Sequence, residues 1–499
     1  MNIKQAKEYI KQTAGIYLKK DELGDYVIPV VRQRPIFLLG APGVGKTAIM
    51  EQIAGELQIA LVSYSMTHHT RQSAIGLPFI KHQIFDGKEY DITEYTMSEI
   101  IATIYETMEE SGIREGILFL DEINCVSETL SPSMLQFLQY KVFGRHRVPD
   151  GWVIVTAGNP PEYNKAVREF DVAVLDRMKI LQVEPDYSIF KEYAIEKGLH
   201  PAIVNFLDMK REYFYRIENT VNGRSYVTAR GWEDLSEILK LYEEEGLPAD
   251  ETLIGQYLTN ETVVSEFGAY YELYNKYKRD YHVNEILGGM INETICKKAG
   301  EASFDERLSL LSMLLDQVLS DIKDNIRRLD AAANTAKILK GAEGKSGKDL
   351  LSYLEGTIEA GKKQLISLQR ASAIGGDEIL MRKRTGRLLE KIKSGALSGD
   401  SSYETVRSIF NAEVEGLKGA GEKCAKELHS LFDFAEKAFG SGDGNELLIL
   451  VTELTVNPYS SRFIARFGSP DYEKHQKELM ISERQINMQE EVRELLKEL

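Results

Sequence analysis

Between Arg34 and about Pro185, short and nearly uninterrupted apolar runs alternate with amphipathic segments. Apolar runs of this kind are typical of strands that are covered on both faces, so the alternation predicts an α/β fold with a largely parallel sheet. The predicted strands of this sheet are residues 36–39, 60–64, 116–120 and 152–157.

From about Tyr187 the pattern becomes mainly helical, and the chain stays helical to its end. Candidate helices of a small second domain are residues 187–198, 200–214 and 229–246. Further on, apolar residues recur at spacings of three or four, which predicts one buried helix face. The residues of this face are Leu308, Leu311, Leu315, Val318, Ile322, Ile326 and Leu329. The predicted parts are an αβ core over 1–187, a helical lid over 188–260 and an all-helical region over 261–499.

Composition narrows the class of protein. A length of 499 residues suggests about three domains. The 43% hydrophobic and 28% charged residues are typical of a soluble globular protein. A net charge of −16 argues against a protein that coats nucleic acid nonspecifically, because phosphate binding needs a surplus of cations. No apolar run approaches the roughly 18 residues of a membrane span, and the first residues lack the apolar core of a signal peptide, so a cytoplasmic location is expected.

Three cysteines, Cys125, Cys296 and Cys424, are far apart in the sequence and lack metal-ligand spacing. They are therefore expected to be reduced, unpaired thiols.

The segment GAPGVGKT, Gly40 to Thr47, lies between a predicted strand and a predicted helix. Glycines let such a loop bring its N–H groups close to phosphate oxygens, and the following helix offers its N-terminal donors to the same anion. Lys46 would add charge at the β- and γ-phosphates, and Thr47 would offer a hydroxyl to Mg²⁺. The loop predicts a P-loop NTPase core.

Downstream, the strand GILFL ends at two adjacent carboxylates, Asp121 and Glu122. In a nucleotide site Asp121 would hold the magnesium shell, and Glu122 would orient and deprotonate the attacking water. The strand GWVIVTAGNP ends at Asn159, whose amide could lie beside the γ-phosphate; a turn residue before Pro160 is the alternative.

The ordered set GAPGVGKT, LFLDEIN, TAGNP, VLDRM and VTARGW resembles the AAA+ ATPases, and within them the MoxR-like branch, over roughly Val27 to Leu258. The resemblance implies ATP and Mg²⁺ as ligands. It assigns Asp121 and Thr47 to the metal, and Glu122, Asn159, Arg177 and Arg230 to catalysis, as Walker B acid, sensor 1, arginine finger and sensor 2. The residues implied to bind nucleotide are Gly40, Ala41, Pro42, Gly43, Val44, Gly45, Lys46, Thr47 and Ala48.

Arginine suits both assigned roles because its planar guanidinium binds phosphate oxygens through a rigid fork and stays charged. Taken alone, Arg177 or Arg230 could equally form a surface salt bridge. Arg168, nine positions before Arg177, is the alternative trans-acting cation.

Two further segments carry open alternatives. MoxR-like proteins have an insertion near residues 65–95 that forms a hairpin facing the ring pore or a partner, and Asp86-Gly87 here fits a tight hairpin turn. His68 and His69 within it are expected to be loop residues rather than metal ligands. The basic segment with Lys141, Arg145, His146 and Arg147 is either a second pore-facing element or a solvated turn.

The expected function is magnesium-dependent ATP hydrolysis by a self-assembled ring, a hexamer by resemblance, that remodels or matures a protein partner. The resemblance implies a chaperone-like role beside a protein with a von Willebrand factor A domain. A non-processive ATP switch is the main alternative, and a nucleic-acid motor is disfavoured by the acidic charge balance.

Overall fold

The computed structural model describes residues 1–68, 74, 76–143, 145–163, 167–168, 170–220, 223–440 and 445–477. The chain forms two compact units. Unit 1 contains Met1–Ile189, Thr228–Arg230 and Ile358–Lys383, and unit 2 contains Phe190–Val227, Gly231–Thr357 and the chain from Arg384 onward.

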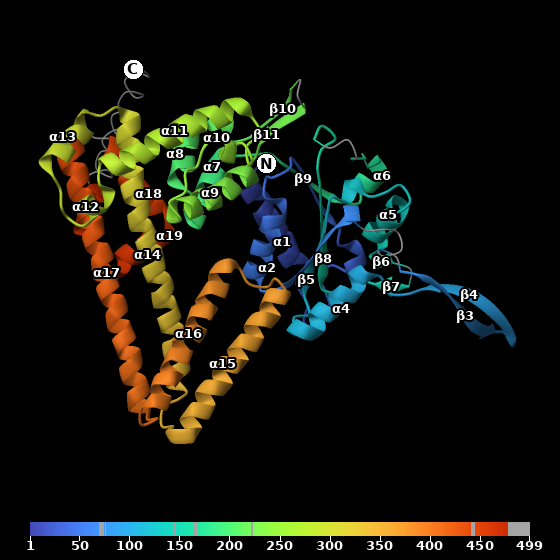
Figure 1. The fold of residues 1–499 in the computed structure, drawn as a ribbon. Coiled ribbons are helices and arrows are strands. Elements are labelled where there is room, and N and C mark those ends of the chain that lie inside the picture. Colours follow the sequence, from blue (N-terminus) through green and yellow to red (C-terminus); the bar gives the residue numbers. More distant parts are fainter. Residues whose placement is uncertain are drawn as a thin grey trace, which may run out of the picture. The chain divides into compact units, whose positions relative to one another are not determined.

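Unit 1 is built on a five-stranded parallel sheet with the order β2-β5-β8-β1-β9 (Figure 1). Its strands are β1 (Ile36–Gly40), β2 (Ala60–Ser65), β5 (Gly116–Asp121), β8 (Trp152–Gly158) and β9 (Lys179–Val183). The prediction of an α/β fold with a parallel sheet is confirmed. The central strands β5 and β8 are buried almost throughout, which is why they read as continuous apolar runs in the sequence.

Helices cover this sheet, and an N-terminal helix packs on the one that follows β1. The helices are α1 (Ile3–Tyr17), α2 (Lys46–Leu57), α4 (Glu99–Ser111), α5 (Ser131–Tyr140) and the short α6 (Val172–Leu175). A capping box of Asn2 and Gln5 starts α1. Lys7 and Lys11 on α1 both pair with Glu56 on α2, so the first residues are fixed against the helix that begins at the glycine-rich loop.

Two antiparallel hairpins extend from unit 1. Strands β3 (Pro78–Phe85) and β4 (Lys88–Tyr95) form the longer one and meet at Asp86 and Gly87, which both have positive φ. Residues 69–73 and 75, with His69, lie outside the described residues. The shorter hairpin pairs β6 (Val142–Phe143) with β7 (His146–Arg147).

Helices α7 (Tyr187–Lys197), α8 (Pro201–Met209) and α9 (Ala229–Glu244) form where the sequence predicts them. A hairpin of β10 (Arg216–Thr220) and β11 (Gly223–Val227) lies between α8 and α9, in a stretch that belongs to none of the candidate helices and for which no strands are predicted. The missed signal is the Asn222-Gly223 dipeptide between two short alternating runs, a sequence typical of hairpin turns.

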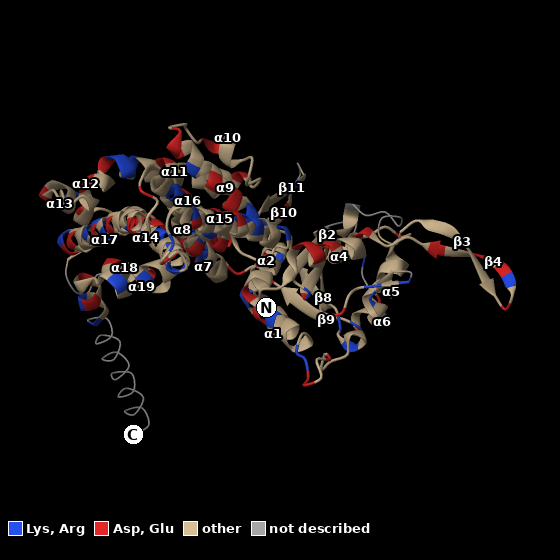
Figure 2. Ribbon diagram, turned by 90° about the horizontal axis from the view of Figure 1, so that it is seen from below, with Lys and Arg blue, Asp and Glu red and all other residues tan. Residues whose placement is uncertain are grey.

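The rest of the described chain is helical, as predicted, and supplies most of unit 2. Its shorter helices are α10 (Glu251–Ile254), α11 (Glu261–Asp280), α12 (Val283–Leu287), α13 (Glu293–Glu301), α18 (Asn445–Val456) and α19 (Pro458–Phe467). Its long helices are α14 (Phe304–Lys340), α15 (Gly347–Arg370), α16 (Gly376–Ser398) and α17 (Tyr403–Phe439). Acidic and basic residues are interspersed along these helices (Figure 2). The predicted apolar stripe lies on α14 and is buried, except for the half-buried Leu308.

No described helix combines the length and apolar character needed to cross a bilayer.

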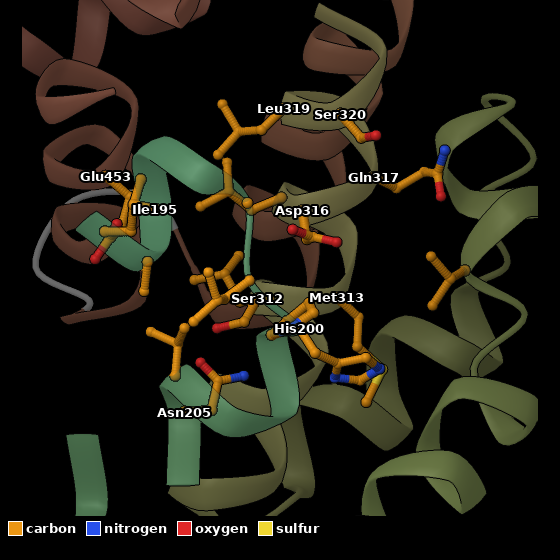
Figure 3. Close-up of a pocket in the computed structure, with 18 of the residues that line it drawn as sticks. Ile195, His200, Asn205, Ser312, Met313, Asp316, Gln317, Leu319, Ser320 and Glu453 are labelled. Carbon is orange, nitrogen blue, oxygen red and sulfur yellow. The ribbon is translucent and has the colours of Figure 1, made fainter. Parts of the chain in front are cut away.

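A cavity of about 1560 Å³ lies within unit 2, with Asp316 and His200 among the residues on its wall (Figure 3). Burial raises the pKa of Asp316. Lys191 on the same wall pairs with Asp208 at 3.0 Å and with Glu453 at 2.9 Å. None of the candidate site residues from the sequence lines this cavity.

Candidate functional site

The loop between β1 and α2 has a backbone that only glycine accommodates easily. Gly43 and Gly45 have φ of +74° and +90°. A Cβ on Gly40 would lie 2.7 Å from the carbonyl oxygen of Val183. Helix α2 begins at Lys46 directly after this bend, so its first backbone N–H groups face the loop and form the kind of anion site found at helix N-termini.

The ammonium group of Lys46 is buried and folds back on its own loop. It donates to the carbonyl oxygens of Gly40 and Ala41, at 2.8 and 2.9 Å, and to Oδ1 of Asn159 at 2.9 Å. Burial lowers the pKa of Lys46 to about 8; the nearby carboxylate of Asp121 opposes this shift, and the positive charge of Arg230 adds to it. A buried cation held by neutral acceptors is stabilised by an incoming anion.

The depressed pKa of Lys46 predicts a pH dependence of the nucleotide-free protein. Because the folded-state pKa of about 8 lies below the usual 10.5, the unfolded chain binds more protons in this window, so Lys46 raises the free energy of unfolding as pH increases from 8 to 10.5. A Lys46→Met variant lacks this contribution. Its stability relative to wild type is therefore expected to be highest near pH 8 and to fall by up to a few kcal/mol toward pH 10.5. Urea unfolding across this range measures the difference, and a constant difference would contradict the prediction.

Strand order brings together side chains that are far apart in the sequence. Strand β8 lies between β1 and β5, so the carboxyl ends of these three strands meet at one edge of the sheet. Asn159, just after β8, contacts Lys46, and the hydroxyl of Thr47 donates to Oδ2 of Asp121 at 3.1 Å. Hydroxyl and carboxylate oxygens are ligands that Mg²⁺ prefers, so Thr47 and Asp121 fit the metal that the sequence predicts here.

Glu122 is held by two hydroxyl groups that the sequence reading did not single out. Its backbone lies in the left-handed region with φ of +55°, and its N–H donates to Oδ1 of Asp121 at 2.9 Å. Its Oε2 accepts from Ser65 at 3.2 Å and from Thr67 at 3.0 Å. Ser65 ends β2 opposite Asp121 in the parallel register. The sequence signal for this contact is the pair of hydroxyl residues, Ser65 and Thr67, that follows the predicted strand 60–64.

Asn124 is a second residue that the sequence reading missed. Its side chain is buried, and the side-chain amide donates to the backbone carbonyl oxygen of Asn159 at 2.8 Å. The backbone carbonyl oxygen of Asn124 accepts from the backbone N–H of Arg168 at 2.9 Å. Gly158 leaves room for it, because a Cβ there would lie 2.5 Å from Oδ1 of Asn124. Asn124 therefore joins the loops that follow β5 and β8.

The three arginines differ in their surroundings. Arg230, at the start of α9, belongs to unit 1 and is close enough to Lys46 to influence its pKa. Arg168 pairs with Glu128 at 2.6 Å. Arg177 is exposed, and within the described residues its guanidinium forms no hydrogen bond or ion pair; nor does any contact there join it to Lys46 or Glu122.

The basic segment after α5 is tied to the longer hairpin rather than being wholly solvated. Lys141 is buried, and this burial lowers its pKa to about 8. Arg145 pairs with Glu94, and a ring nitrogen of His146 lies 3.4 Å from the carbonyl oxygen of Tyr95. Among the described residues no group of three or more His, Cys, Asp or Glu side chains is arranged to hold a metal ion, and none of the three cysteines forms a disulfide.

A glycine-rich loop with a buried lysine, an acidic strand end and an asparagine on the intervening strand, all on a parallel five-stranded sheet, defines the nucleotide-binding unit as a P-loop NTPase core. Residues 36–177 match the sequence model of the ATPase family associated with various cellular activities (AAA). The match supports an ATPase of the AAA+ type. No curated protein matches the chain.

Proposed function

We propose that this protein is a magnesium-dependent AAA+ ATPase of the MoxR-like type, which assembles into a ring and uses ATP hydrolysis to remodel or mature a protein partner. The observation that carries the proposal is the meeting of Lys46, Thr47, Asp121 and Asn159 at the ends of three adjacent strands. Strands β1 and β5 lie on either side of β8, so this arrangement depends on the order of the strands in the sheet.

The loop from Gly40 to Ala48 is proposed to hold the phosphates. Its helix N-terminus supplies oriented N–H donors, and Lys46, now satisfied by two loop carbonyls and Asn159, exchanges these neutral acceptors for phosphate oxygens. Thr47 and Asp121 are proposed to hold Mg²⁺, which neutralises charge on the phosphate oxygens when bound.

Glu122 is proposed to orient and deprotonate the attacking water, with Asn159 positioning the same water or the γ-phosphate. In the structure Oε2 of Glu122 accepts hydrogen bonds from Ser65 and Thr67. We propose that hydrolysis follows when the Glu122 carboxylate leaves these hydroxyls and turns toward the water. The hydrogen bonds from Ser65 and Thr67 therefore restrain the side chain of Glu122, the proposed base.

Arginines are proposed to complete the site in two ways. Arg230 acts within its own subunit, where its charge already reaches Lys46. Arg177 is proposed to act on the site of a neighbouring subunit, because it is exposed and unpaired among the described residues. Repeated head-to-tail contacts of this kind are proposed to close into a ring. Arg168, engaged with Glu128, is the alternative donor.

The partner is proposed from the MoxR resemblance of the motifs: a protein with a von Willebrand factor A domain, in the cytoplasm. The β3–β4 hairpin is a candidate contact because Phe79, Ile80, Ile84 and Phe85 are exposed on it. A non-processive ATP switch is the second candidate function. The observation that favours it is the restraint on Glu122, which suits a protein that binds ATP and hydrolyses it only on a signal.

Phosphate release from ATP by the purified full-length chain tests the proposal. We expect turnover with Mg²⁺, none after chelation of the metal, and none in a Lys46→Ala variant, which loses the cation at the phosphates. An Arg32→Ala variant is the matched control, because it removes an exposed cation outside the loop. Equal turnover by Lys46→Ala and wild type would overturn the proposal.

A further inference from the structure

Residues 358–383 come from the helical half of the chain but pack with the nucleotide-binding unit. They comprise the end of α15, the turn after it and the first part of α16; we call them the α15–α16 tip. Two alanines of the turn, Ala371 and Ala373, are 1% and 2% exposed and lie in the hydrophobic cluster that also contains Ile100 and Ile104 of α4. The tip is therefore part of the core of unit 1.

The tip is hydrogen-bonded to the edge of the sheet. Strand β2 is an edge strand, with β5 on one side. On its other side, the backbone N–H of Leu61 donates to the carbonyl oxygen of Ala371 at 2.8 Å. An unpaired edge N–H in an apolar surrounding is costly, and the tip satisfies it.

Polar contacts and a close approach fix the tip on the neighbouring helices. The hydroxyl of Ser367 donates to the carbonyl oxygen of Glu110 at 3.0 Å, and Arg370 pairs with the carboxylate of Glu110 at 3.0 Å. On the α2 side, a Cβ on Gly55 would lie 3.4 Å from the backbone nitrogen of Gly375. The tip thus touches the ends of both helices that flank β2.

Strand β2, which the tip contacts, also carries the residues next to the carboxylate of Glu122. Leu61 lies near the start of β2 and Ser65 at its end, and Ser65 and Thr67 hold Glu122. Leu61 and Ser65 thus belong to one short strand that is paired with β5 from Ala60 to Ser65, which is the physical connection between the tip and Glu122.

We propose that the α15–α16 tip is a positioning element for ATP hydrolysis: by fixing β2, it keeps Ser65 and Thr67 on Glu122. The inference rests on the proposed function of Glu122 as the base. Helices α15 and α16 run without a break from the tip into unit 2, so a protein partner that displaces these helices loosens β2 and releases Glu122. The helical half is thereby a regulator of the hydrolysis site.

The test uses a mild variant of the full-length chain, Ser367→Ala with Arg370→Ala, which removes both polar contacts and leaves the buried alanines in place. Lys363→Ala is the matched control, since it removes an exposed cation from the same helix. We expect basal turnover to rise about threefold with KM unchanged, the size of a typical coupling within one network.

A cycle with the double variant Ser65→Ala and Thr67→Ala, which removes both hydroxyls from Glu122, separates positioning from a general loss of stability. If the tip acts through the hold on Glu122, adding the tip variant to this double variant produces no further rise in turnover; independent, multiplying effects would overturn the inference. Hydrogen exchange of residues 61–67 gives a readout that does not need hydrolysis. Faster exchange there in the tip variant supports the link, and unchanged exchange overturns it. A wild-type chain that does not hydrolyse ATP would refute the proposed function, and the exchange experiment would still decide whether the tip controls β2.

Discussion

Replacing Glu122 with glutamine is expected to lower ATP turnover by about 10²- to 10⁴-fold while nucleotide binding persists. The amide oxygen of glutamine still accepts from Ser65 and Thr67, and the contacts of Lys46 and Thr47 are untouched. Only the ability to take a proton from water is lost. Phosphate release and binding of a fluorescent ATP analogue measure the two effects separately.

The same variant tests assembly, because it traps bound nucleotide. Light scattering with Mg²⁺ and ATP is expected to show a shift from small species to about six protomers, as head-to-tail contacts close a ring. Adding Lys46→Ala should abolish the shift. A monomer or dimer that ignores ATP would exclude the ring and favour the ATP switch.

Replacing Arg177 with alanine is expected to reduce turnover by about 10³- to 10⁵-fold, the range observed for arginine fingers that stabilise charge on a transferring phosphoryl group. Nucleotide binding by each subunit is expected to be unchanged, since no contact among the described residues joins Arg177 to Lys46 or Glu122. The fold is also expected to be unchanged, because the side chain is exposed.

Mixing subunits shows whether Arg177 acts in trans. Glu122→Gln subunits retain Arg177, and Arg177→Ala subunits retain Glu122, so a mixed ring contains some complete sites and should regain part of the activity. Arg168→Ala is the control, and loss of its surface pair with Glu128 is expected to change turnover little. If Arg168→Ala is the inactive variant and Arg177→Ala is active, Arg168 is the trans-acting residue.

Local patterns were readable from the sequence because the physical constraint lies within a few residues. The phosphate loop needs glycines at positions with positive φ or a close neighbour, as at Gly43 and Gly45, and a lysine at the start of the next helix. Buried parallel strands read as apolar runs, and the α14 stripe reads as a periodic pattern. The β10–β11 hairpin was missed because two five-residue strands carry a weak periodic signal beside strong helices.

Features that depend on contacts between distant residues could not be predicted from local sequence patterns. Strand order decides that β8 lies between β1 and β5, which brings Asn159 to Lys46 across 113 positions of the sequence. The hydroxyls on Glu122 come from the last residue of β2 and from Thr67 just after it, and no local pattern encodes the position of β2 beside β5.

The sequence by itself determined the nucleotide-binding class of this protein, the parallel sheet and the helical character of its second half, because each follows from residue types at short spacing. Only the tertiary structure decided that Glu122 is restrained, that Asn124 joins two loops of the site and that residues 358–383 complete the core of the nucleotide-binding unit. These features arise from contacts between segments separated by tens to hundreds of residues, where burial and hydrogen bonding select the partner and sequence spacing carries no information.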